Sequence, residues 1–230
     1  MYPIKVKFKN QLVGLQYRDD ADQSVINEIY KYQEYRCAEE AIITAVDSVV
    51  DVGAHGGYFS FYARILNPKV KIYALEPERE NIKFFARQMK DGGWKNITLI
   101  EAALAEKTGK RELVRATDSH NHRLALPGEK VDGKINIVQV YSFADFCVSY
   151  KIDKIFLMKI DIEGGEHELL ASLKDDDWKK IEALVIEYHN KRKDDFLRLE
   201  NIIRQRGYGV QVFPSRFDKS MGIIFARRKK

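Results

Sequence analysis

Residues 48–57, with the sequence SVVDVGAHGG, are the stretch that decides the fold. Its first five residues form a short apolar run rich in β-branched side chains, which predicts a buried strand. Glycines follow, and the pattern over residues 58–66 then becomes helical. Because glycine has no Cβ atom, such a turn lets the main chain approach a ligand closely. The stretch therefore predicts a strand, a ligand-binding turn and a helix.

The same alternation continues along the chain. Strands are expected at 70–75, 97–100, 155–160 and 183–186, and helices at 78–90, 166–173 and 194–206. Strand-like pieces at 111–114 and 135–140 flank a polar linker, 117–133, and the chain closes with a hairpin at 208–213 and 222–226. Alternating strands and helices imply crossover connections. We therefore expect a Rossmann-like, doubly wound α/β domain whose mostly parallel sheet ends in an antiparallel β-hairpin.

A short strand and helix extension precedes this domain. Residues 4–17 alternate in their first half, with Lys5, Lys7 and Lys9 on one face, which predicts one arm of an edge hairpin. Residues 22–35 have the apolar spacing of a helix. We assign residues 1–40 to an N-terminal extension packed on the main domain, and residues 41–230 to that domain.

The composition is that of an ordinary globular chain. The 230 residues are 45% apolar and 32% charged, with 14 Gly and 5 Pro, which excludes collagen-like and disordered classes. Cys37 and Cys147 are 110 positions apart, so neither a disulfide framework nor a thiolate zinc site is expected. With no long apolar run and no leader pattern at the start, we expect a cytoplasmic protein without a membrane span.

Acidic residues lie at the ends of the first three strands of the predicted sheet. The loop at Asp51 lacks both the G-x-G-x-x-G pattern of dinucleotide sites and a phosphate-binding Gly-Lys-Ser/Thr. A carboxylate there would repel a pyrophosphate but attract the ammonium and sulfonium groups of S-adenosylmethionine. Glu76 comes 25 residues later, close to the spacing at which an acid binds ribose hydroxyls. Glu101 and the small Ala102 end the third strand, where they could border an adenine ring.

The segment richest in charge is KIDIEGGE, residues 159–166, which follows the apolar run 155–158. Charges directly after a buried strand must be solvated, paired or functional. If the strand geometry persists, alternation places Lys159, Asp161 and Glu163 on the same side. Because open α/β sheets bind ligands at the carboxyl ends of their strands, we predict that this segment forms the reaction centre.

The motifs DVGAHGGYFSFYA, YALEP, ITLIEAALAEKTG and MKIDIEGGEHELL occur in this order between residues 51 and 170. Together they resemble the FkbM family of S-adenosylmethionine-dependent methyltransferases, which has the class I methyltransferase fold, over roughly residues 22–190. The family commonly has Asn and an aliphatic residue where this chain has His55 and Gly56, so the role of His55 stays open. The resemblance implies cofactor contacts from Asp51, Gly53, Gly57, Glu76, Glu101 and Ala102, with Asp161 facing the reaction centre. Ala54, His55 and Asp161 complete our candidate cofactor-binding residues.

The reaction that the resemblance implies is transfer of a methyl group to an acceptor. In-line positioning supplies much of the catalysis, and a hydroxyl acceptor also benefits from a base. We expect Asp161 to orient the acceptor or the cofactor, and either Asp161 or His189 to take the proton. Lys159 and Glu163 complete the candidate catalytic residues. A metal site built from His189, Asp161 and Glu187 matches no recognised ligand spacing, so no required metal is expected.

Three functions remain open. O-methylation of a saccharide, glycolipid or secondary metabolite is favoured by the resemblance and by the lack of an N-P-P-Y-type motif after the fourth strand. RNA methylation is the alternative, because residues 191–230 carry 12 basic and 4 acidic side chains, with Tyr208, Phe213 and Phe217 nearby. The third function is that of a non-catalytic adenosyl-binding protein, against which the charged residues of the predicted reaction centre argue.

Overall fold

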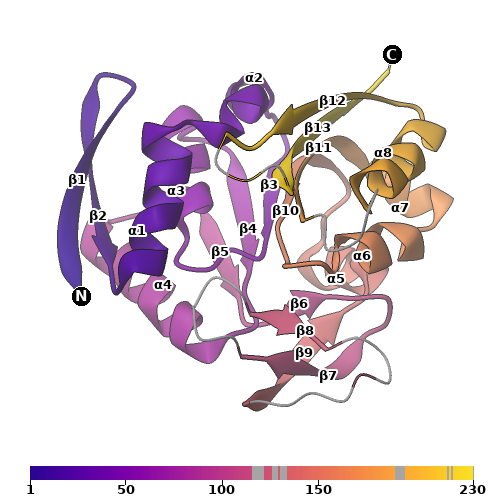
Figure 1. Cartoon of the computed structure of the whole chain (residues 1–230), viewed down its shortest axis with the longest axis horizontal. Coiled ribbons are helices and arrows are strands. Elements are labelled where there is room, and N and C mark those ends of the chain that lie inside the picture. Colours follow the sequence, from indigo (N-terminus) through magenta and orange to yellow (C-terminus); the bar gives the residue numbers. More distant parts are fainter. Residues whose placement is uncertain are drawn as a thin grey trace.

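The computed structural model describes residues 1–115, 122–125, 129, 134–189, 195–216, 218 and 220–229. A seven-stranded sheet, in the order β12-β13-β11-β10-β3-β4-β5, forms the centre of the molecule (Figure 1). Its strands are β3 (Ser48–Val52), β4 (Lys71–Leu75), β5 (Ile97–Ile100), β10 (Ile155–Ile160), β11 (Ile181–His189), β12 (Tyr208–Pro214) and β13 (Met221–Arg228). Only β13 pairs antiparallel to its two neighbours. The predicted mostly parallel sheet with a terminal hairpin is confirmed.

The winding of the sheet reverses between β3 and β10. From β3 the chain proceeds to β4 and β5 on one side, and from β10 it proceeds to β11 on the other. Asp51 and Lys159 are register partners across this boundary. Connections diverge at such a point, which leaves a crevice at the carboxyl ends of the two strands.

Two hydrophobic cores cover the faces of the sheet, because successive side chains of each strand point to opposite faces. Val49 and Leu157 belong to one core, and Val50 and Met158 belong to the other. Each fully buried aliphatic side chain contributes about 1.5–3 kcal/mol, so the strand ends are held firmly. The first core includes α2 (Glu39–Ile43), α3 (Tyr58–Leu66) and α4 (Arg79–Gly92), and the second includes α5 (Phe143–Tyr150), α6 (Glu166–Ser172), α7 (Asp175–Lys180) and α8 (Asp195–Gln205).

The N-terminal segment packs on the outside of the first core (Figure 1). It consists of the antiparallel hairpin β1 (Tyr2–Phe8) and β2 (Gln11–Tyr17), α1 (Asp20–Ile26), a π-helical turn (Asn27–Lys31) and a 3-10 helix (Glu34–Ala38). The hairpin was predicted, but one continuous helix over 22–35 was wrong, because Gln33 has a left-handed φ of 55° that ends the helical path. The rings of Phe8 and Tyr62, whose centroids are 4.9 Å apart, attach the hairpin to α3.

A second, smaller sheet lies beside the main one, at the lower edge of Figure 1. Its strands are β6 (Ala103–Leu104), β7 (Gly109–Val114), β8 (Arg123–Leu124) and β9 (Ile135–Tyr141), in the order β6-β9-β7-β8. The predicted strands 111–114 and 135–140 are confirmed, whereas the linker 117–133 lies outside the described residues except for 122–125 and 129. Within the described part of the chain, no helix combines the length and apolar character needed to span a membrane.

Candidate active site

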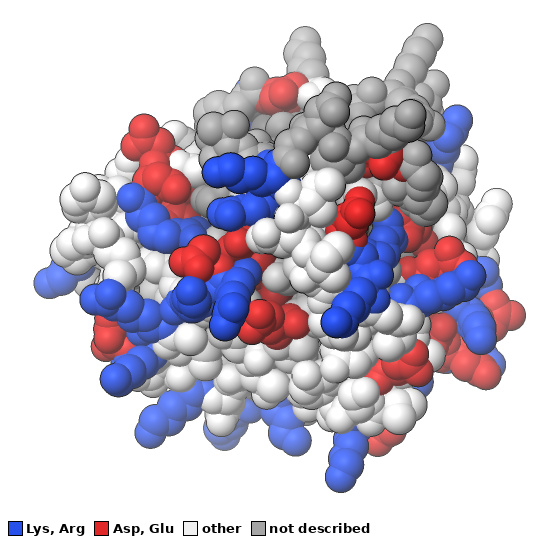
Figure 2. All heavy atoms as spheres, turned by 90° about the horizontal axis from the view of Figure 1, so that it is seen from below, with Lys and Arg blue, Asp and Glu red and all other residues white. Residues whose placement is uncertain are grey.

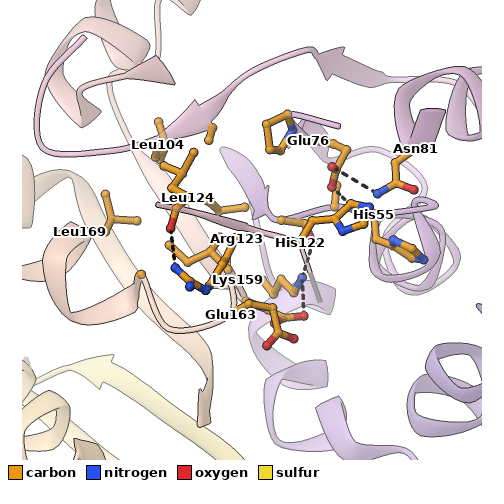
Figure 3. Close-up of a pocket in the computed structure, with 18 of the residues that line it drawn as sticks. His55, Glu76, Asn81, Leu104, His122, Arg123, Leu124, Lys159, Glu163 and Leu169 are labelled. Atoms are coloured by element: carbon orange, nitrogen blue, oxygen red, sulfur yellow. Dashed lines mark hydrogen bonds and ion pairs between the residues drawn. The ribbon is translucent and has the colours of Figure 1, made fainter. Parts of the chain in front are cut away.

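A cavity of about 250 Å³ opens at the carboxyl ends of β3, β4 and β10, where the winding of the sheet reverses. Three parts of the chain line it in addition to the strand ends (Figure 3). Tyr35 comes from the N-terminal segment, the loop 53–55 from the main sheet, and Arg111 and Leu124 from the smaller sheet. The cavity therefore lies between the three units of the fold.

Glu76 forms part of the cavity wall directly after β4, and its carboxylate is held by the main chain around it (Figure 3). The backbone N–H of His55 donates to Oε2 at 2.8 Å, and the backbone N–H of Glu78 donates to Oε1 at 2.8 Å. Burial raises the pKa of Glu76, although the His55 ring and the N–H donors act in the opposite direction. The loop after β3 is thus attached to the acid that follows β4.

Lys159 is buried beneath the same loop. Its Nζ donates to the carbonyl oxygen of Gly53 at 2.8 Å and lies 3.4 Å from Asp51 Oδ1 and 3.3 Å from Asp161 Oδ2. Burial lowers the pKa of Lys159, but the two carboxylates outweigh this effect and the pKa is raised. The lysine is therefore a permanent cation that joins the ends of β3 and β10. Asp51 Oδ2 accepts a further hydrogen bond from the Ser60 hydroxyl.

Two glycines of the loop are required by close packing. Gly53 has a φ of +79°, and a Cβ atom there would lie 1.8 Å from the carbonyl oxygen of Asp161. Gly57 has a φ of +88°, and its Cβ would lie 2.2 Å from the ring of Phe85. Gly53 thus allows the contact between the two strand ends, and Gly57 allows α3 to begin against α4.

His55 connects this loop to the N-terminal segment. Its Nε2 lies 2.6 Å from Oδ1 of Asp22, a fully buried carboxylate, and the guanidinium of Arg18 donates to both Asp22 oxygens at 2.8 Å. Burial raises the pKa of Asp22, but the hydrogen bonds from Arg18 and His55 outweigh it and hold the pKa well below its ordinary value. Sequence reasoning missed Arg18 and Asp22, because their only local signal was the start of a helix.

A second charged cluster lies where β10 and β11 end. His189 Nε2 is 3.6 Å from Glu163 Oε1 and 3.8 Å from Glu187 Oε1. The Tyr35 hydroxyl donates to Glu187 Oε2 at 3.1 Å, and burial, together with the charge of Asp161, raises the pKa of Glu187 well above its ordinary value. The extended alternation that we considered for this segment stops at Ile160, where β10 ends; Glu163 has a φ of 60°.

The structure brings most of the predicted site residues together. The ones that line the cavity are Gly53, Ala54, His55, Glu76, Lys159, Asp161 and Glu163. Asp51 and Gly57 are not among the lining residues, and His189 approaches Glu163 from β11. Glu101 is exposed, Ala102 is buried, and residues 103–105 line the cavity at that strand end instead. The adenine contact of Glu101 and Ala102 stays a prediction. The lining residues that were not predicted include Tyr35, Arg111, His122 and Leu124.

Some of the C-terminal basic residues that the structure describes are engaged within the protein. Arg204 and Arg206 each form an ion pair with an acidic side chain. Tyr208 is 1% exposed and donates to the Ile181 carbonyl oxygen, so its ring belongs to the core; Phe217 lies outside the described residues. Figure 2 shows the molecule from the side of the smaller sheet, and on that face basic and acidic groups are intermixed among the coloured residues.

A family model described as the methyltransferase FkbM domain matches residues 51–210. The chain belongs to the FkbM methyltransferase family. It is 27% identical over 198 residues to the 31-O-demethyl-FK506 methyltransferase FkbM of Streptomyces tacrolimicus, covering 72% of this chain and 73% of that protein. It is 21% identical over 197 residues to methyltransferase 1 of Beauveria bassiana (strain ARSEF 2860), covering 77% and 78%.

Solved structures show the same fold as this FkbM-family chain. Precorrin-6y C5,15-methyltransferase from Geobacter metallireducens GS-15 has a TM-score of 0.51 at 17% identity, covering 86% of this chain and 88% of that one. Magnesium protoporphyrin IX methyltransferase from Synechocystis PCC 6803, solved with bound S-adenosylmethionine, has a TM-score of 0.50 at 11% identity, covering 94% and 87%. The chain is a methyltransferase with the class I methyltransferase fold, as the resemblance implied.

Proposed function

We propose that this FkbM-family methyltransferase binds S-adenosylmethionine in the cavity and methylates a hydroxyl group of a saccharide, glycolipid or secondary metabolite. The position of Glu76 at the end of β4, beside the loop 53–55, carries the proposal. An acid at this point of a doubly wound sheet accepts hydrogen bonds from ribose hydroxyls. The printed name of the Streptomyces relative, a 31-O-demethyl-FK506 methyltransferase, supports oxygen as the acceptor atom.

The charge of the cavity suits a cationic cofactor. Asp161 and Glu163 line it together with Glu76, whereas the buried ammonium of Lys159 is shared between Asp51 and Asp161. Two opposite unit charges 4 Å apart attract by about 1 kcal/mol in water and about 4 kcal/mol near a protein surface. A sulfonium and an ammonium group would therefore bind favourably here.

The transfer itself forms a bond between the acceptor oxygen and the methyl carbon while the bond from sulfur to that carbon breaks. Sulfur keeps the electron pair, and the hydroxyl loses its proton. In-line alignment of these atoms supplies much of the rate. We assign control of the hydroxyl proton to Asp161 and His189, and we assign Lys159 to holding the Gly53 carbonyl rather than to the acceptor.

Calorimetric titration with S-adenosylmethionine and S-adenosylhomocysteine tests the cofactor half of the proposal. Glu76→Gln removes the charge that faces the ribose and is expected to weaken binding at least about tenfold, since a hydrogen bond to a charged group is worth about 1.5–3 kcal/mol. Glu80→Gln is the matched control, because Glu80 is 60% exposed on the neighbouring helix α4. Equal binding by both variants, or no binding by the wild-type protein, would contradict the proposal.

The acceptor half is tested by transfer of a radiolabelled methyl group. Cell extract is fractionated into saccharides and small molecules, lipids, and RNA, and each fraction is incubated with the protein and the labelled donor. Label in a saccharide, small-molecule or glycolipid fraction supports the proposal, and label confined to RNA contradicts it. Wild-type protein boiled before the assay gives the background.

A further inference from the structure

We propose that Asp161, Glu163 and His189 bind one divalent cation, and that this cation holds the acceptor hydroxyl. The inference rests on the proposed function and sharpens it. One ligand atom from each of the three side chains lies within 4.8 Å of the others. Two oxygen ligands on opposite sides of one ion are about 4.2 Å apart for Mg²⁺ and up to about 5 Å apart for Ca²⁺. The three side chains can therefore reach a single ion with small rotations.

The position of His189 brings one of its ring nitrogens to this cluster. Its side chain is 10% exposed, and its Nδ1 is buried without a hydrogen-bond partner. Its Nε2 faces Glu163 at 3.6 Å and Glu187 at 3.8 Å, and both distances exceed those of a hydrogen bond. The ring nitrogen Nε2 is thus directed at carboxylates that a shared cation would join.

The local charges also favour a cation. Asp161 and Glu163 lie on the loop after β10, and Glu187 lies on β11 beside His189. The buried ammonium in contact with this cluster is that of Lys159, which is 3.3 Å from Asp161 and is shared with Asp51. Carboxylates with an imidazole are ligands that Mg²⁺, Mn²⁺ and related ions accept.

A cation at this point would define the class of acceptor. It would bind the acceptor oxygen and lower the pKa of the hydroxyl, so that the proton leaves to water as the bond to the methyl carbon forms. Asp161 and His189 would then affect the loss of that proton by holding the ion that lowers the pKa of the hydroxyl. An acceptor with two neighbouring oxygens, such as a vicinal diol or a hydroxycarbonyl, would bind best because both oxygens reach the ion. This inference departs from our expectation that no metal is required.

The test measures Mn²⁺ binding separately from catalysis. Chelator-treated protein with S-adenosylhomocysteine is titrated with MnCl₂, and free Mn²⁺ is followed by electron paramagnetic resonance. We expect one site per wild-type chain, at least tenfold weaker binding in Glu163→Gln and His189→Asn, and no change in Asp176→Asn, whose side chain is 89% exposed on α7. Broadening of the His189 ring signals by Mn²⁺ in the nuclear magnetic resonance spectrum of the wild-type protein locates the ion without any substitution.

Any of three results would overturn the inference. They are a wild-type protein that binds no Mn²⁺, an unchanged Mn²⁺ affinity in both folded site variants, and His189 signals that Mn²⁺ does not broaden. Calorimetry with S-adenosylmethionine on the same samples separates the two proposals. Protein that binds S-adenosylmethionine but no Mn²⁺ contradicts the cation site alone. Protein that binds Mn²⁺ at these residues but no S-adenosylmethionine contradicts the proposed function alone.

Discussion

Asp22 and His55 are 33 positions apart in the chain, yet Oδ1 of Asp22 lies 2.6 Å from Nε2 of His55. Asp22 belongs to the first N-terminal helix, and His55 belongs to the loop that lines the cavity. The backbone N–H of His55 also donates to Glu76. The N-terminal segment is therefore connected, through the side chain and the backbone N–H of His55, to the acid that we assign to the ribose.

Asp22→Asn is expected to lower the free energy of unfolding by about 3 kcal/mol at pH 7, because it leaves Arg18 without its buried carboxylate. The pKa of Asp22 is lowered in the folded chain, so the stabilisation is complete above the unfolded-state pKa of about 4 and is lost as the pH falls below it. The difference between wild type and variant should shrink between pH 5 and pH 3 in urea unfolding. Asp20→Asn, at an exposed position of the same helix, is the control. A difference in unfolding free energy between wild type and Asp22→Asn that does not change with pH would contradict this account.

Gly53→Ala is expected to destabilise the protein by about 3 kcal/mol or more, because it adds a backbone clash to a left-handed conformation. Gly93→Ala is the matched control, since Gly93 also has a positive φ, +64°, but has open space around its Cβ position. Gly93→Ala should lower the free energy of unfolding by only about 1–2 kcal/mol. Thermal unfolding followed by circular dichroism compares the two variants, and equal losses would show that the contact with Asp161 is unimportant.

Lys159→Met removes the buried cation between Asp51 and Asp161 and is expected to cost about 3–5 kcal/mol, because a buried charge loses its partner. Adding Asp51→Asn should recover part of the loss, with a coupling energy of about 1 kcal/mol or more. Denaturant unfolding of the wild type, the two single variants and the double variant gives this coupling energy as a double-mutant cycle. Simple additivity of the two losses would mean that the ion pair contributes little.

Asp161→Asn and His189→Ala are each expected to lower methyl transfer at saturating cofactor by about 100-fold, the size of a typical contribution from proton control. Both side chains are at the cavity or beside it, so the fold should persist. Single-turnover transfer to the identified acceptor measures the rate, and circular dichroism checks the fold. Glu80→Gln should transfer at the wild-type rate. Unchanged rates in both site variants would exclude the assignment.

The fold could be predicted closely wherever its signal is local. The strands 97–100 and 155–160 have the predicted bounds, because each is an apolar run that a polar segment ends. β11 extends to Ile181–His189 beyond the predicted 183–186, since pairing with β10 begins at Ile181 and pairing with β13 continues the strand through Glu187 to His189. The positions of Gly53 and Glu76 in the cavity followed from the strand ends for the same reason.

The remaining part of the site depends on contacts between distant segments. Nothing in the pattern around Asp22 indicates a carboxylate bound to His55, because the hairpin must first pack on α3. The left-handed conformations at Gln33 and Glu163 are set by packing as well. A residue other than glycine does not predict a positive φ angle. Consequently the predicted helix over 22–35 was too long. The alternation of side chains after β10 could not predict the turn that contains Glu163.

The smaller sheet has a hydrophobic core of its own, in which Leu113, Val138 and Val140 pack together, and it contributes Arg111 and Leu124 to the cavity. The side chains of β7 and β9 that form this core can therefore change with little repacking of β3, β4 or β10, whereas Leu104 of β6 belongs to the core that those three strands share. An enzyme engineer who wants to reshape this wall of the cavity would accordingly begin with Arg111 and Leu124.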